Sequence, residues 1–217
     1  MTDQELKRSV EEELNWERDI KSPTKVGVGV KDGIVTLSGH VESYTEKLAA
    51  EEAATRVAGV KAIVNELDVR LPFSSERTDE DIARAAANAL DWTTAVPRDQ
   101  IKVTVNGGWI ILRGVVPWYF QKLAAEAAVR DLFGVKGVRN LIDVQPSVNR
   151  AVVKSSIEEA LKRDAEIDAK SITVETSGSK VILKGKVRSW FEKQEAERVA
   201  WRAPGVAKVE NAIDVAA

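Results

Sequence analysis

The chain repeats one unit of related sequence three times, and this repeat limits its fold more than any other feature. Segments of equal length beginning at Gly33, Gly108 and Ser179 align without a gap. Two sets of glycines and one set of asparagines recur in register. They are Gly39, Gly114 and Gly185, then Gly59, Gly134 and Gly205, and finally Asn65, Asn140 and Asn211. Tandem copies of one small module are therefore predicted.

The repeat extends upstream, where apolar residues at i, i+4 and i+8 begin at Leu6, Ile82 and Val153. The predicted domains are residues 1–70, 77–145 and 150–217, named modules 1, 2 and 3. Pro, Ser and charged residues in segments 71–80 and 145–150 indicate linkers between them.

Each module is predicted to run helix, strand, strand, helix, strand. In module 1, Thr2 or Asp3 can cap a first helix whose apolar stripe begins at Leu6. Val26, Val28 and Val30 alternate with small residues, as in a strand. The predicted class is α+β: three tandem α-β-β-α-β modules, each a three-stranded mixed sheet covered on one face by two helices. The second helix makes the crossover to the last strand.

Tight turns and recurring residues refine this prediction. Asp32-Gly33 and Asn106-Gly107 are hairpin signals, because such pairs supply positive φ angles. The glycine near the end of each second strand indicates a backbone requirement, such as a bulge or the close approach of a helix, with a ligand contact as the alternative. The repeated asparagines are expected to bond nearby backbone and set a bend, with a shared polar binding role as the alternative.

These landmarks resemble the BON domain family. The matching pattern is a hairpin ending V-x-L-x-G, an alanine-rich helix, then G-V and V-x-N-x-[LI]-x-V, and it covers nearly the whole chain in three copies. The resemblance implies a non-enzymatic module of bacterial envelopes, associated with osmotic stress and secretion channels, for which phospholipid binding is the usual proposal. It also implies a periplasmic or outer-membrane location with a leader segment.

Composition excludes several kinds of site. The chain has no cysteine and a single histidine, His40, so Cys-based and multi-His metal centres cannot form. We expect no enzyme activity, no cofactor and no metal. A net charge of −2 does not favour nucleic acid as a partner. No segment is long and apolar enough for a transmembrane span.

The N-terminal residues lack the pattern of a secretory signal, which predicts a soluble, cytoplasmic protein. The mature form of an exported protein would look the same, so a periplasmic location stays open. The oligomeric state is not indicated.

Aromatic residues gather where each second helix begins. The helical period places Trp118 near the core stripe and turns Tyr44, Tyr119 and Trp190 to one outer side, with Phe120 and Phe191 on the other. Trp201 is expected on the side of Trp190, whereas Trp16 and Trp92 are expected to pack at helix ends. The candidate binding residues, with the lysines that recur beside them, are Tyr44, Lys47, Trp118, Tyr119, Phe120, Lys122, Trp190, Phe191, Lys193 and Trp201.

Three interpretations of these aromatics stay open. The first is packing between modules or against the end of a sheet. The second is contact with a phospholipid surface, since aromatic rings and lysine suit the interface of an anionic bilayer. The third is a protein partner, such as another envelope protein, in a protein-interaction or chaperone-like role. Residues 1–70 carry 10 basic and 14 acidic groups (−4), whereas residues 71–150 carry 10 and 9 and residues 151–217 carry 12 and 11 (+1 each). Modules 2 and 3 are therefore the better candidates for an anionic surface.

Overall fold

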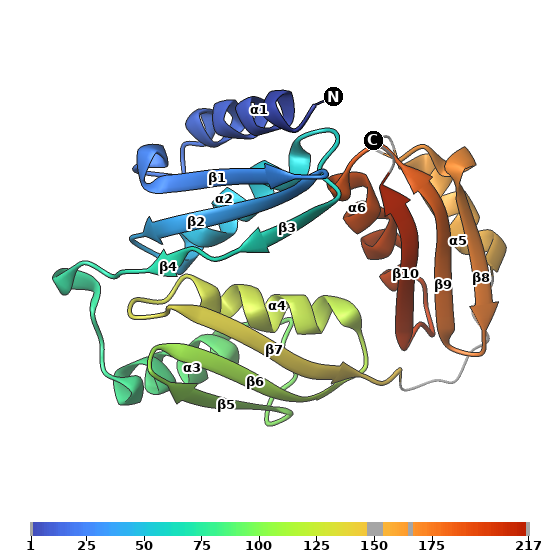
Figure 1. The fold of residues 1–217 in the computed structure, drawn as a ribbon. Coiled ribbons are helices and arrows are strands. Elements are labelled where there is room, and N and C mark those ends of the chain that lie inside the picture. Colours follow the sequence, from blue (N-terminus) through green and yellow to red (C-terminus); the bar gives the residue numbers. More distant parts are fainter. Residues whose placement is uncertain (1, 147–153, 165–166, 216–217) are drawn as a thin grey trace. The chain divides into compact units, whose positions relative to one another are not determined.

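The computed structural model describes residues 2–146, 154–164 and 167–215. It contains three separate mixed sheets, each with helices packed on it, and this confirms the three tandem α+β modules (Figure 1). In each sheet the second strand is central, antiparallel to the first and parallel to the last. The parallel pair is joined through the second helix, as predicted for the crossover.

Module 1 has the expected order, but its last strand is interrupted at Glu66 and Leu67. The backbone N–H of Glu66 donates to the carbonyl of Leu37 at 2.8 Å across this interruption. Its elements are α1 (Asp3–Trp16), η1 (Pro23–Lys25), β1 (Val26–Lys31), β2 (Ile34–Val41), α2 (Tyr44–Arg56), β3 (Ala62–Asn65) and β4 (Asp68–Val69).

Module 2 has an unbroken last strand. Its elements are α3 (Asp79–Trp92), β5 (Ile101–Asn106), β6 (Trp109–Val116), α4 (Tyr119–Arg130) and β7 (Gly137–Val144). The short helix η2 (Phe73–Ser75) lies in the predicted first linker, and α3 already begins within it. The module boundaries themselves stay a prediction.

Module 3 repeats this order, and Figure 1 shows its two helices on the same face of the sheet. The predicted start of its first helix at Val153 lies outside the described residues, as do residues 147–150 of the second predicted linker. Its elements are α5 (Lys154–Arg163), η3 (Ala169–Ser171), β8 (Ile172–Ser177), β9 (Lys180–Val187), α6 (Trp190–Trp201) and β10 (Lys208–Val215).

The first helices of modules 1 and 2 are capped by threonine. Thr2 and Thr78 accept from the N–H of Glu5 and Asp81, and Glu5 accepts in return from the N–H of Thr2, so module 1 has a capping box. Behind each cap the predicted apolar stripes are buried. They are Leu6, Val10 and Leu14 in α1 and Ile82, Ala86 and Leu90 in α3.

An aspartate one residue after each of these caps ties the helix to the hairpin. Asp3 accepts from the N–H of Asp32 at 2.8 Å and of Gly33 at 3.1 Å. Asp79 does the same for Gly107 and Gly108, at 2.7 Å and 2.9 Å. The first helix is thus bonded to a turn about thirty residues further along the chain.

The hairpin turns occupy two residues in each module. Asp32 and Gly33 have φ angles of +54° and +81°, as predicted. In module 2 the predicted turn is wrong by one residue, because Asn106 pairs with Trp109 and the turn residues are Gly107 and Gly108. Two glycines in succession adopt the required positive φ angles with less strain than asparagine followed by glycine.

The glycine near the end of each second strand lies against the backbone that enters the first strand. The φ angle of Gly39 is +106°, and a Cβ there would lie 2.2 Å from the carbonyl oxygen of Lys25. A Cβ on Gly114 or Gly185 would lie 2.0 Å from the corresponding carbonyl oxygen. The close neighbour is therefore this carbonyl, which in modules 1 and 3 belongs to the last residue of the short helices η1 and η3. Gly59, Gly134 and Gly205 follow the second helices with φ angles of +91°, +88° and +86°.

The repeated asparagines join the last strand to the second helix. Asn140 Nδ2 donates to the carbonyl of Lys122 at 2.8 Å and to Glu126 at 3.0 Å, and its Oδ1 accepts from the N–H of Ile142 at 3.2 Å. Asn211 makes the same three bonds, and Asn65 bonds Glu51 and the N–H of Leu67. The predicted bonds to nearby backbone are confirmed, and these amides are engaged within their own modules.

Candidate functional site

The second helices of modules 1 and 3 begin with a serine and a buried glutamate. Ser43 Oγ accepts from the N–H of Glu46 at 3.1 Å, and Ser189 Oγ accepts from the N–H of Glu192 at the same distance. Each glutamate accepts in return from the N–H of the residue before the serine, at 2.7 Å and 2.9 Å. Both side chains are 3% exposed. These helix starts are thus closed by a reciprocal pair of bonds around a carboxylate.

Module 2 replaces both residues. Trp118 stands where the serines stand, with φ −136° and ψ 140° and no side-chain cap. Gln121 replaces the glutamate, and its Oε1 accepts from the N–H of Trp118 at 3.1 Å. Losing a serine cap costs about 1 kcal/mol. The helix cap is kept in two copies and lost in the third. Such a local departure is expected where a residue serves function instead of folding.

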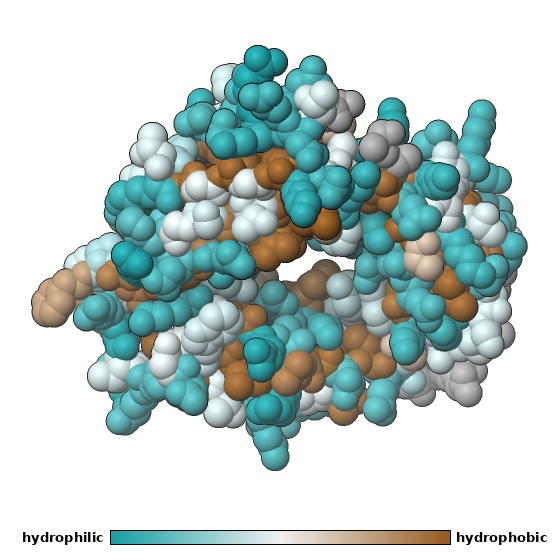
Figure 2. Space-filling model, viewed as in Figure 1, coloured by the Kyte–Doolittle hydropathy of each residue, from teal (hydrophilic) through white to brown (hydrophobic). Residues whose placement is uncertain are grey.

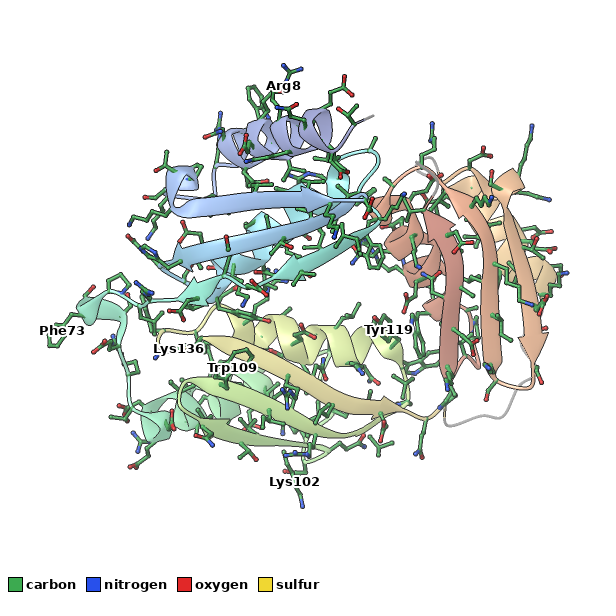
Figure 3. The ribbon with its side chains drawn as sticks, in the orientation of Figure 1. Arg8, Phe73, Lys102, Trp109, Tyr119 and Lys136 are labelled. Carbon is green, nitrogen blue, oxygen red and sulfur yellow. The ribbon has the colours of Figure 1, made fainter. Side chains whose placement is uncertain are left out.

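Three apolar side chains of this helix start face solvent. Trp118 is 43% exposed, Phe120 56% and Leu123 40%, and we name them the helix-start patch. The prediction that Trp118 leans to the core is wrong. Trp118 precedes the helix and has an extended backbone, so the rotation of 100° per helical residue does not describe its direction. Phe120 points outward as expected. Tyr119, which is labelled in Figure 3, and Lys122 are both half-buried.

The corresponding residues of module 1 form no such patch. Tyr44 is only 9% exposed, so the prediction that it turns outward is wrong. The side chain of the first helical residue leans toward the preceding chain, so its wheel angle does not describe its surroundings. Lys47 is half-buried, and Thr45 stands where module 2 has Phe120.

In module 3 the aromatics are half-buried. Lys193 Nζ lies 5.1 Å from the ring centroid of Trp190, a cation–π contact within one helix turn. Phe191 is half-buried beside it. Trp201, expected on the exposed side, packs against the core of its module and is half-buried. This prediction is wrong, because Trp201 contacts the hydrophobic core cluster of module 3.

The face of the module 2 sheet away from its helices also exposes apolar groups. Trp109, Val115 and Leu141 are 45%, 43% and 45% exposed, and Figure 2 shows hydrophobic surface between hydrophilic side chains over β6 and β7. The ring of Trp109, which is labelled in Figure 3, lies over Gly137, since a Cβ on Gly137 would come within 2.3 Å of it. Gly137 was missed from the sequence, because only the strand register shows that it faces Trp109.

Cations on the same face have no acidic partner. Lys102 and Arg113 are cross-strand neighbours, and neither they nor Arg139 on β7 form an ion pair among the described residues. On the corresponding face of module 3, lysines are bonded to glutamates. These pairs are Lys180–Glu210 at 2.6 Å and Lys184–Glu175 at 2.8 Å. Module 2 therefore combines exposed apolar groups with unneutralised positive charge.

Two helix-end tryptophans are far more exposed than expected. Trp16 is 84% and Trp92 88% exposed, so the prediction of helix-end packing is wrong. Each is the last residue of its helix, beyond the final buried leucine.

Among the described residues no cluster of three or more His, Asp or Glu side chains could hold a metal ion. Within the same part of the chain, no helix combines the length and apolar character that crossing a bilayer requires.

Comparison with known proteins gives a family and a similar curated protein. The family model of the BON domain matches residues 2–70, 78–146 and 149–217. The osmotically-inducible protein Y of Escherichia coli (strain K12) is 30% identical over 149 residues, which are 64% of this chain and 71% of that protein.

Solved structures also match this chain, among them two of one protein. Both are of CdsD, a structural protein of the type III secretion system of Chlamydia trachomatis, and one is its C-terminal domain. They are 14% identical, with TM-scores of 0.24 and 0.26, and cover 98% and 100% of this chain and 92% and 100% of their own.

Proposed function

This chain belongs to the BON domain family, and from that membership we propose a non-enzymatic binding protein of bacterial envelopes under osmotic stress. The curated relative is named for osmotic induction, which supports this setting. The proposed ligand is a phospholipid surface, and the proposed contact is module 2.

The distribution of exposed apolar side chains carries this proposal. Among the described residues, most of the large exposed ones belong to module 2. They are Trp92, Trp109, Val115, Trp118, Phe120, Leu123, Phe133 and Leu141. In module 3 no described large hydrophobic residue is exposed to the same degree. Clustered exposure of this kind marks a contact surface.

The helix-start patch suits the interface of an anionic bilayer. Aromatic rings favour headgroup depth, and Lys122 lies within the same first turns of α4. Gln121 replaces the carboxylate found in the other two modules, so no buried negative charge lies beneath the patch. The unpaired cations of module 2 add attraction to anionic lipid.

Removing both rings is expected to weaken vesicle binding at least about tenfold, because each buried aromatic contributes roughly 1.5–3 kcal/mol. The variant is Trp118→Ala with Phe120→Ala. The measurement is co-sedimentation of the full chain with phosphatidylglycerol-containing vesicles at low salt, compared with pure phosphatidylcholine.

A matched control is Trp16→Ala with Phe73→Ala, which removes one tryptophan and one phenylalanine that are 84% and 92% exposed elsewhere. This control is expected to bind like the unaltered chain. Equal binding by the patch variant, or equal loss in the control, would contradict the proposal.

The uncovered sheet face favours a second candidate, a protein-interaction or chaperone-like module. Trp109, Val115 and Leu141 expose apolar surface there, on the face away from the helices of module 2. Suppression of aggregation of a denatured client protein without lipid, together with no vesicle binding, would favour this candidate.

A further inference from the structure

In module 1 an arginine joins the ends of the two helices. The guanidinium of Arg56, the last residue of α2, lies 3.1 Å from Glu13 and 2.6 Å from Glu17. The hydrogen bond to Glu17 raises the pKa of Arg56 and lowers the pKa of the glutamate. The charge of this arginine is therefore satisfied within the module.

Module 3 keeps the arginine and loses the first of its partners. Arg202 aligns with Arg56, in the same register as Gly205 with Gly59. Ala160 aligns with Glu13 in the first helix. The Arg202 side chain makes no hydrogen bond and no ion pair within the part of the chain that the structure describes. Module 2 has Asp131 at this position, so within the described ranges module 3 is the one copy in which an arginine here lacks a partner.

A cavity of about 500 Å³ opens where that partner is missing. Arg163, which aligns with the exposed Trp16, contributes a second guanidinium. Among the described residues it forms an ion pair with Glu159, which is 3.9 Å long between side chains about 70% exposed and so holds the arginine weakly. The lining consists of Ser156, Ala160, Arg163, Asp164, Val199, Arg202, Ala203 and Pro204.

The chemistry of this lining is two cations, one carboxylate, one hydroxyl and a floor of small apolar side chains. The two arginines exceed Asp164 by one positive charge. Guanidinium groups match the oxygens of phosphate in paired hydrogen bonds, and Ser156 offers a further donor. The volume lies in the range of small-molecule sites and leaves room for an organic group against Ala160 and Val199.

We propose that the cavity between α5 and α6 binds a small organic phosphate ester, with Arg202 and Arg163 on the phosphate. The ester group could belong to a free metabolite or to a lipid headgroup, and both share this chemistry. The site lies in module 3, so it does not rest on lipid binding by module 2.

In the test, the full chain is titrated with sn-glycerol 3-phosphate. Binding is measured by calorimetry and by NMR of the arginine side chains. Arg202→Ala is expected to weaken binding at least about tenfold, the effect of losing a charged hydrogen bond. Lys186→Ala removes an exposed cation of module 3 outside the cavity and is expected to change nothing.

A second variant, Ala160→Glu, recreates the pairing of module 1 and closes the cavity. It is expected to abolish binding while leaving the thermal unfolding midpoint unchanged or higher. The patch variant, Trp118→Ala with Phe120→Ala, is expected to keep binding sn-glycerol 3-phosphate, which separates this site from the proposed function.

Phosphatidylglycerol vesicles distinguish the two sources of the ester. Vesicle binding that depends on Arg202 identifies a headgroup, whereas binding of sn-glycerol 3-phosphate alone identifies a free ester. The proposal is overturned if neither probe depends on Arg202, or if Ala160→Glu binds like the unaltered chain.

Discussion

Replacing Gly39 with alanine is expected to lower the free energy of unfolding of module 1 by about 3 kcal/mol or more. The new Cβ would lie 2.2 Å from the carbonyl oxygen of Lys25, and the residue has a φ angle of +106°. This carbonyl is backbone directly before Val26, so it cannot move away without disturbing the Val26–Gly39 pair. A module of this size has a small free energy of unfolding, so a loss of this size is a large part of it.

The measurement is thermal unfolding, with amide hydrogen exchange assigned to residues of β1 and β2. A loss of this size lowers the unfolding midpoint of a small domain by about 12 °C or more. Gly29→Ala is the matched control, because its Cβ meets nothing closer than 3.8 Å in the same hairpin. An unchanged midpoint for the Gly39 variant would show that the strand entry is not close-packed.

Asn140→Ala is expected to lower the free energy of unfolding of module 2 by about 2 kcal/mol, because it leaves partly buried groups without partners. These are the carbonyl of Lys122, the carboxylate of Glu126 and the N–H of Ile142. The bond to the Lys122 carbonyl also holds the first turns of α4, where the helix-start patch lies. Chemical denaturation measures the loss.

Asn88→Ala in the same module removes an exposed amide and is the control, with an expected change within about 0.5 kcal/mol. Asn140→Asp adds a pH test. It places a second carboxylate beside Glu126, which raises the pKa of one of them in the folded state, so this variant should lose stability as pH rises through that raised value. A destabilisation independent of pH would mean that the carboxylate of Glu126 does not face the amide.

The repeat made the fold predictable. Three aligned copies reveal which residues every copy needs, so the helices, the central strand and the asparagine bonds followed from the sequence alone. Asn140 and Asn211 illustrate this, since a polar residue kept at one strand position in each copy needs a partner within each copy.

The candidate site was predictable only in part. The helical period placed Phe120 correctly but not Trp118 or Tyr44. Trp118 precedes the helix, where the period does not apply, and Tyr44 is in the first turn, where it predicts side-chain directions poorly. Trp16 and Trp92 lie at the last residue of their helices, where no apolar neighbour follows to bury them. Periodicity describes the interior of an element, and its ends depend on capping and on the neighbouring chain.

The cavity in module 3 was recognised only from the sequence and the structure together. Sequence alignment shows that Ala160 replaces Glu13, but nothing in the sequence shows that Glu13 bonds Arg56. The distances in module 1 show this bond. They therefore identify Ala160 as the position where the arginine of module 3 lacks its carboxylate.

The proposed contact of module 2 with a lipid surface is tested most directly by paramagnetic relaxation from spin-labelled lipid in phosphatidylglycerol-containing vesicles. Backbone amides of residues 118–123 should broaden more than those of residues 44–48 and 190–194, which begin the second helices of the other two modules. Absent broadening at residues 118–123, or equal broadening at all three helix starts, would contradict the account.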